Sequence, residues 1–182
     1  MDDTKNDAAI ASGAATAPAE APSTADQKRV ADLLVRLRDN QNFGAALAGG
    51  FLGAVIGAVL WALITVATNF EIGWEAVGVG FLVGFGVRIL GHGIDPQFGY
   101  AGAVLSLFGI ALGNVLTGML IVSKSQSIPF TELASHMDPK FAWVLLTAGL
   151  SPIDLLFYGL GVYYGYRYSF HRPTQQELAS LR

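Results

Sequence analysis

The stretch FGAALAGGFLGAVIGAVLWALITVA occupies residues 43–67 and contains no charged side chain. A helix of this length rises about 37 Å, because each residue adds about 1.5 Å. The hydrocarbon core of a bilayer is about 30 Å thick, so the stretch can cross it with some tilt. Residues 43–67 are therefore predicted to form a transmembrane helix.

Two further apolar stretches follow the first. Residues 73–90 are interrupted only by Glu75 near the start and Arg88 near the end. Residues 99–122 contain Asn114 as their only strongly polar side chain. Both stretches are long enough to cross a bilayer as helices, and we expect them to form the second and third spans.

The last apolar stretch, residues 141–168, is long enough to cross but is interrupted in the middle. The sequence SPID at residues 151–154 suits a new helix, with serine at the N-cap, proline at N1 and aspartate at N3. Gly149 can end the preceding helix in a left-handed conformation. The sequence thus predicts a short helix that opens at Pro139, a break, and a final spanning helix over residues 152–168.

These patterns predict an all-α fold, an integral membrane bundle of four transmembrane helices with a broken segment before the last span. The composition agrees, because the 182 residues are 52% hydrophobic and only 14% charged, with a mean hydropathy of +0.46. A soluble domain has roughly 25% charged residues. The net charge of −3 provides no basic excess for phosphates, so nucleic acid is not expected as a partner. The absence of cysteine excludes disulfides and thiolate chemistry.

The composition divides the chain into four segments. Residues 1–23 are rich in Ala, Pro, Asp and Thr, and we expect a disordered tail on the cytoplasmic side. Residues 24–40 are predicted to form an amphipathic helix, residues 41–170 the four-helix membrane domain, and residues 171–182 a cytoplasmic C-terminal tail.

The amphipathic helix is predicted from the spacing of its apolar residues. Val30, Leu33, Leu34 and Leu37 fall at i, i+3, i+4 and i+7, which places them on one helix face. Basic side chains on the other face suit an anionic leaflet, with the leucines inserted at the acyl boundary. Packing of this helix against a neighbouring copy is the alternative.

Lys and Arg are unequally distributed outside the apolar stretches. Nine lie before the first span, near the second connection or at the end of the chain, whereas two lie in the remaining connection. The positive-inside rule then places both termini in the cytoplasm. Trp61, Trp74 and Trp143 would lie toward the outer interface, as part of an aromatic belt.

Glycines recur four positions apart in the predicted spans. In lipid, such faces allow two helix backbones to approach closely and gain dispersion energy. The pattern suits packing within the chain and also a homo-oligomeric interface. The glycines concerned are Gly49, Gly53, Gly57, Gly80, Gly84, Gly109, Gly113, Gly161 and Gly165.

Five polar residues are candidates for a functional site. Arg88, His92 and Asp95 lie together after the second span, and they suit an anion or proton site with Arg88 paired to Asp95. The alternative is an arginine that extends to the headgroups beside a glycine-rich turn. Asp154 is expected either to cap the last helix or to bind a ligand at the helix break, with Asn114 as its partner.

No cofactor or metal is expected. His136, Glu132 and Asp138 are ligand types in the third connection, but three residues without a fourth are a poor zinc site. The sequence also lacks a Ser, His and Asp set, an HExxH motif, a phosphate-binding loop and a dinucleotide fingerprint.

Two stretches carry a resemblance to known proteins. The run EIGWEAVGVGFLVGFGVR at residues 71–88, followed by Gly91, Gly93 and Asp95, resembles a pattern in small Gly-rich bacterial multi-helix membrane proteins of unassigned function. The sequence SPIDLLF at residues 151–157 is similar to a segment of their last helix. The resemblance implies a multi-pass protein of the bacterial cytoplasmic (inner) membrane, but it implies no activity, substrate or catalytic residue.

The sequence favours a non-enzymatic membrane module that packs with itself or with a membrane-protein partner through its small-residue faces. A small channel or transporter component that uses Asp154, Asn114 and Arg88 is the alternative. An intramembrane enzyme is the third possibility, and no catalytic residue is assigned.

Overall fold

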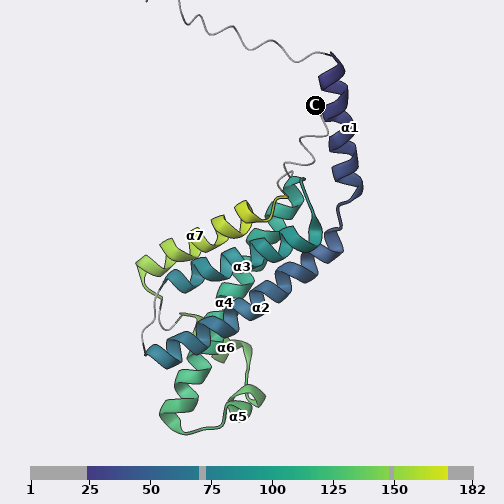
Figure 1. Cartoon of the computed structure of the whole chain (residues 1–182). Coiled ribbons are helices and arrows are strands. Elements are labelled where there is room, and N and C mark those ends of the chain that lie inside the picture. The colour runs from purple at the N-terminus through teal and green to yellow at the C-terminus, as the bar shows by residue number, and fades with distance from the viewer. Residues whose placement is uncertain (1–23, 70–72, 148–149, 172–182) are drawn as a thin grey trace, which may run out of the picture.

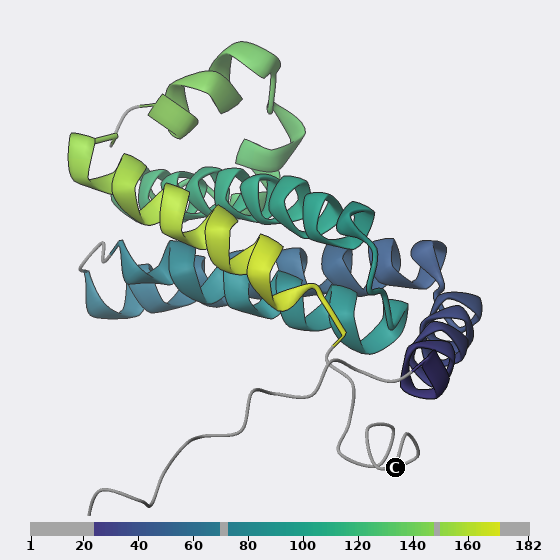
Figure 2. The same cartoon turned by 90° about the horizontal axis from the view of Figure 1, so that it is seen from above.

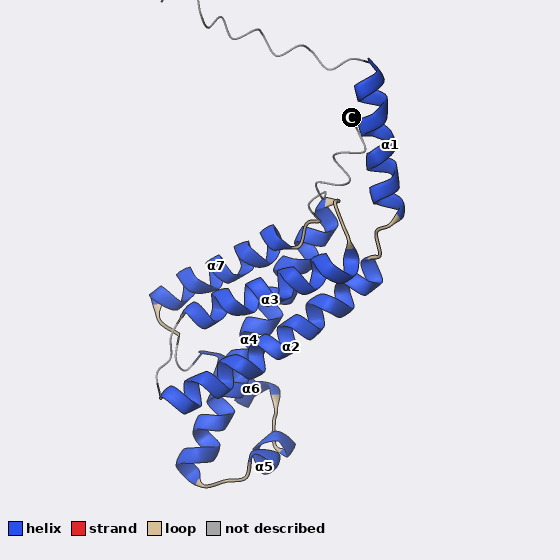
Figure 3. Cartoon of the chain, viewed as in Figure 1, coloured by secondary structure: helices blue, strands red, loops and turns tan. Residues whose placement is uncertain are grey.

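The computed structural model describes residues 24–69, 73–147 and 150–171. Within these ranges every regular element is a helix (Figure 3). The predicted tail at 1–23, all but the first residue of the predicted tail at 171–182, and Gly149 lie outside the described residues. The helices, labelled as in Figure 1, are α1 (Thr24–Asp39), α2 (Phe43–Thr68), α3 (Trp74–Gly91), α4 (Pro96–Gln126), α5 (Phe130–Ser135), α6 (Pro139–Thr147) and α7 (Pro152–Tyr168).

Three helices, α2, α3 and α4, are long and apolar enough to cross a membrane. The α6–α7 pair would make a fourth span if the two are taken together, although they meet at an angle of 103°. The structure therefore supports a multi-pass membrane protein with three to four spans.

The helix limits follow the predictions closely where the start and stop signals are local. Helix α2 ends one residue beyond the expected span, and α7 begins at Pro152 as predicted. Helix α4 is longer than the predicted 99–122, because it begins at Pro96 in position N1 and continues through polar residues to Gln126. The short α5 was not predicted, since its stretch is too polar to appear as a span.

The bundle is built around α3 and α4, which contact each other and both contact α2 and α7. Helix α1 extends from one end of the bundle, whereas α5 and α6 lie at the opposite end (Figures 1 and 2). We call these the α1 end and the α5 end. Large apolar side chains on the outer surfaces, among them Phe51, Leu63 and Val104, are exposed in the isolated chain, as expected for surfaces that face lipid.

All nine glycines of the predicted packing faces contact other parts of the same chain. A Cβ on Gly53 of α2 would lie 2.6 Å from the carbonyl oxygen of Leu82 in α3. Gly80 and Gly84 of α3 approach Gly161 and Gly165 of α7 in the same way, so these two helices run parallel. The close approaches are intrachain, which is one of the two packing arrangements that the sequence allows.

Two glycines of α4 make close contacts with α2 in the same way. A Cβ on Gly109 would lie 3.1 Å from the Cα atom of Ala54, and a Cβ on Gly113 would lie 2.8 Å from the indole ring of Trp61. Gly49 and Gly57 complete the set, facing Gly86 and Val79 of α3 respectively.

The position of Trp61 differs from the prediction. Its side chain is only 3% exposed, and its ring packs 6.3 Å from that of Tyr158 in α7. Trp61 is therefore a core residue, whereas Trp74 and Trp143 are 65% exposed as a belt would require. The glycine at position 113 explains the difference, because it leaves room for an indole ring inside the bundle.

Replacing Gly80 with Ala should destabilise the bundle, because the new methyl group would collide with the backbone of Gly161. Gly78 is the matched control in the same helix, since nothing lies within 4 Å of its Cβ position. Gly78→Ala should leave stability unchanged or raise it by about 0.5–1 kcal/mol through helix propensity. Thermal unfolding in mild detergent measures both, and equal stabilities would refute the close-packing account.

Candidate functional site

Asp95 is held at the α1 end of the bundle by residues that precede the first span. Its Oδ1 atom lies 3.3 Å from Nε of Arg38, and its Oδ2 atom accepts a hydrogen bond of 3.0 Å from Nε2 of Gln41. The predicted pairing of Asp95 with Arg88 is therefore wrong. Arg38 could not be identified from the sequence as the partner, because it lies 57 residues away in the sequence and belongs to the helix outside the bundle.

Gln41 connects the α1–α2 linker to the α3–α4 linker. Its Oε1 atom accepts hydrogen bonds from the backbone N–H groups of Ile94 (3.3 Å) and Asp95 (3.4 Å). The next residue, Asn42, donates its N–H to the carbonyl of Gly91 at 2.9 Å, and its side chain caps α2 by accepting from Ala45. The two linkers thus form one hydrogen-bonded unit, which we call the linker latch.

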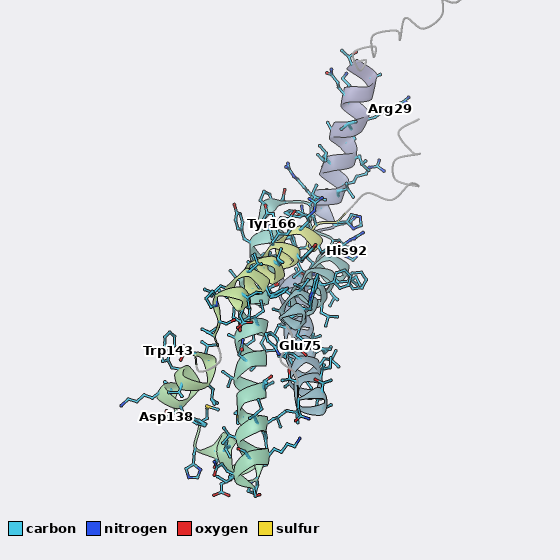
Figure 4. The ribbon with its side chains drawn as sticks, turned by 90° about the vertical axis from the view of Figure 1, so that its left-hand side faces the viewer. Arg29, Glu75, His92, Asp138, Trp143 and Tyr166 are labelled. Carbon is cyan, nitrogen blue, oxygen red and sulfur yellow. The ribbon has the colours of Figure 1, made fainter. Side chains whose placement is uncertain are left out.

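His92 lies beside the linker latch and ends α3. It adopts a left-handed conformation with φ of 50°, and its N–H donates to the carbonyl of Arg88 at 3.1 Å. Its ring, labelled in Figure 4, lies 5.8 Å from that of His171. The two histidines line a cavity of about 310 Å³ together with Leu37 and Asn40. His171, which was not predicted, is positioned by donating its N–H to Gly93 at 2.7 Å.

Arg88 is half-buried in the last turn of α3. A cation there interacts favourably with the carbonyl end of the helix. The structure thus brings Arg88, His92 and Asp95 to the same end of the bundle, and Asp95 is paired with Arg38 in place of Arg88.

Asn114 and Asp154 are not partners, contrary to the prediction. Asn114 in α4 is joined to Tyr158 in α7, with Nδ2 2.8 Å and Oδ1 3.0 Å from the phenol oxygen. Asp154 instead accepts two hydrogen bonds of 2.8 Å at Oδ2, from the N–H and the hydroxyl of Ser151. Asn114 therefore joins two spanning helices, and Asp154 stabilises the first turn of α7.

Glu75 is the acidic side chain of the second predicted span, and it was not among the candidate site residues. In the structure it lies in the first turn of α3, among the helices of the bundle (Figure 4). Its Oε2 atom accepts a hydrogen bond of 3.0 Å from the hydroxyl of Thr65, which is only 4% exposed. Its charge inside an apolar stretch was the signal that could have identified it.

A groove lies beside this hydrogen bond at the α5 end of the bundle. Its volume is about 480 Å³, and its lining residues include Thr65 together with Asn69, Lys124 and Ser125. Lys124 donates from Nζ to Oδ1 of Asn69 at 3.5 Å, which joins α4 to the end of α2. Thr65 therefore both lines the groove and binds Glu75.

The polar residues of the third connection form hydrogen bonds with residues three or four positions away in the sequence. His136 Nδ1 lies 2.9 Å from the carbonyl oxygen of Glu132, and Asp138 accepts the N–H of Phe141 at 2.6 Å at the start of α6. Asp138 lies beside α6 in Figure 4. Among the described residues, no group of three or more His, Asp or Glu side chains is placed to hold a metal ion.

No protein-family model, curated protein or solved structure matches the chain. The functional interpretation therefore depends on the residues and contacts described above.

Replacing Gln41 with Ala should loosen the linker latch. The substitution removes the hydrogen bonds to Asp95 and Ile94, and we expect a loss of about 1 kcal/mol together with faster amide exchange at residues 94–95. Arg38→Ala is the control, because an ion pair with an arginine that is 63% exposed contributes little. Hydrogen exchange by mass spectrometry in nanodiscs measures both. Protection of residues 94–95 that survives Gln41→Ala would contradict the role of Gln41.

Substitutions at Asp154 separate capping from a role of its charge. Asp154→Asn keeps an acceptor for the N–H of Ser151 and should cost at most about 1 kcal/mol, whereas Asp154→Leu removes the acceptor and should cost more. Thermal unfolding of both variants is the measurement. If Asn were as damaging as Leu, the negative charge itself would be required at this position.

Proposed function

We propose that the chain is a four-span protein of the bacterial cytoplasmic membrane with both termini in the cytoplasm. An even number of crossings is supported because the residues just before the first span and just after the last span lie at the same end of the bundle. Asn42, which precedes the first span, donates to Gly91, and His171, which follows the last, donates to Gly93. The excess of Lys and Arg before the first span and after the last supports the cytoplasmic assignment.

The function that the geometry supports best is a non-enzymatic membrane module that presents α1 at the cytoplasmic surface. The single observation that supports it is the position of α1, which extends from the bundle (Figure 1) with large apolar side chains uncovered. Val30, Leu34 and Val35 are between 44% and 58% exposed. An apolar face of this kind is unfavourable in water, so α1 contacts an anionic lipid surface, a second copy of the chain or a membrane-protein partner.

The sequence analysis placed the site of association on the glycine faces, whereas this proposal places it on α1. The nine glycines make close contacts within the chain, so little of those faces is available to another molecule. Leu33 and Leu37 face inward relative to Leu34, since Leu33 is half-buried and Leu37 is 7% exposed. The exposed side of α1 is the part of the predicted apolar stripe that is available to a partner.

A small channel or transporter component is the second candidate. Asp154, Asn114 and Arg88 provide little support for it, because Asp154 and Asn114 are bonded to Ser151 and Tyr158 rather than to each other, and Arg88 lies in the last turn of α3 at the α1 end. The contact of Glu75 with a residue that lines a groove provides more.

The position of α1 can be tested with single cysteines, because the chain has none of its own. Leu34→Cys carries an environment-sensitive dye on the apolar face, and Asp32→Cys carries it on the polar face as the control. In nanodiscs that contain one chain and anionic lipid, contact with lipid should shift the emission of the dye at residue 34 to the blue and leave residue 32 unchanged.

The comparison of two preparations identifies what covers α1. A blue shift in single-chain nanodiscs supports a lipid surface, whereas a shift that occurs only in vesicles with many chains supports contact between copies. A dye at residue 34 that stays as exposed as one at residue 32 in both preparations would refute the proposal.

A further inference from the structure

Glu75 is an acidic side chain placed between two spanning helices. It lies in the first turn of α3 and faces the last turns of α2, where the Thr65 hydroxyl donates to it at 3.0 Å. Its second carboxyl oxygen, Oε1, is buried. Glu75 is half-buried overall, and an ionisable group within an apolar span is unfavourable unless it has polar partners.

Two further polar atoms are buried in the same part of the bundle. Within the part of the chain that the structure describes, Nε1 of Trp61 and Oγ1 of Thr117 have no hydrogen-bond partner, although their side chains are only 3% and 2% exposed. Trp61 and Glu75 line one cavity of about 150 Å³, which is large enough for water, since each molecule takes up about 30 Å³. Thr117 lies one turn after Gly113, whose surface contacts the Trp61 ring.

Few charges lie on the helices that pack against α3 at this end. Helix α2 contains no charged residue, and Lys124 is the only charged residue of α4. Helix α7 contributes Asp154, which is bonded to Ser151, and the neutral Tyr158, which is bonded to Asn114.

Thr65 connects Glu75 to the groove at the α5 end. The threonine lines that groove of about 480 Å³, and its hydroxyl also donates to Glu75. A hydroxyl can accept one hydrogen bond while it donates another, so it can join water in the groove to the carboxylate. Glu75 is thus half-buried, with its Oε1 atom buried, and it lies one hydrogen bond away from a groove.

We propose that Glu75 is a proton-binding site that exchanges its proton with water through the groove lined by Thr65. In the ionised state the carboxylate accepts from the Thr65 hydroxyl, and Trp61 lines the same cavity as Glu75. On protonation, a hydronium ion in the groove gives its proton to a carboxylate oxygen and leaves as water. The side chain then carries no charge, and its hydrogen bonds rearrange around Trp61.

The test uses Trp61 as the reporter in the chain of 182 residues. Trp74 and Trp143, the other two tryptophans, are replaced with Phe, which is mild because both are 65% exposed. In nanodiscs, the emission of Trp61 should change with pH in a single titration. Glu75→Gln should abolish the change, whereas Asp154→Asn, which removes another acid at the same end, should leave it intact.

Glu75→Asp keeps the proposal falsifiable if Glu75→Gln does not fold. The shorter side chain retains a titratable group at a different distance from Thr65, so the midpoint of the Trp61 titration should move. A titration that is identical in wild type and in Glu75→Asp, one that persists in Glu75→Gln, or Trp61 emission that does not respond to pH in wild type would each overturn the proposal.

Access through the groove is tested by blocking it. Ser125 lines the groove, and its neighbour Gln126 is exposed outside the lining. A bulky maleimide on Ser125→Cys should slow the Trp61 response to a pH jump severalfold, whereas the same reagent on Gln126→Cys should not. Equal rates in the two labelled proteins would show that the proton does not enter through this groove.

Discussion

The membrane interior offers neither water for unpaired backbone groups nor a hydrophobic driving force between apolar helices. The helices of this chain therefore depend on close backbone contact, and glycine makes that contact possible. Gly80 of α3 rests against the backbone of Gly161 in α7, and Gly53 of α2 rests against Leu82 of α3. Dispersion between backbones at this distance adds to the burial of large side chains such as Trp61 and Phe98. Other large apolar side chains, among them Phe51 and Leu63, lie on the outer surface.

Local signals in the sequence were sufficient for the helix limits, because they act within one turn. Pro152 begins α7 since Ser151 and Asp154 provide the cap from adjacent positions. The same reasoning applied to Asp95 and Pro96 would have placed the start of α4 correctly, but the apolar pattern that defined the span begins later. A hydropathy pattern reports where the lipid-facing part of a helix ends, and it does not report where the helix ends.

The partners of polar residues could not be predicted, because they depend on which helix faces meet. Asn114 is 44 residues from Tyr158, and only the packing of α4 against α7 brings them together. The sequence assigned Trp61 to the membrane interface from its position along α2 alone. The side of α2 on which Trp61 lies faces the core of the bundle, so the side chain is buried. The linker latch could not be predicted for the same reason, because the residues next to Gln41 in the sequence do not indicate its contact with residues 94–95. Periodicity predicts that a face exists, whereas the neighbour on that face is a property of the whole bundle.

The charged residues at the helix ends follow one rule that is independent of the membrane. Helices α3 and α7 each have an acid in the first turn, Glu75 and Asp154, and each has an arginine in the last turn. Helix α4 runs the opposite way and still has Asp95 at its N-cap and Lys124 in its last turn. Acids at N-termini and bases at C-termini stabilise the partial charges of any helix. Arg88 and Lys124 are thus accounted for without reference to the side of the membrane, and they contribute little to the assignment of orientation. That assignment depends on the basic residues of α1 and of the chain ends, which lie outside the spanning helices and do not stabilise their C-termini.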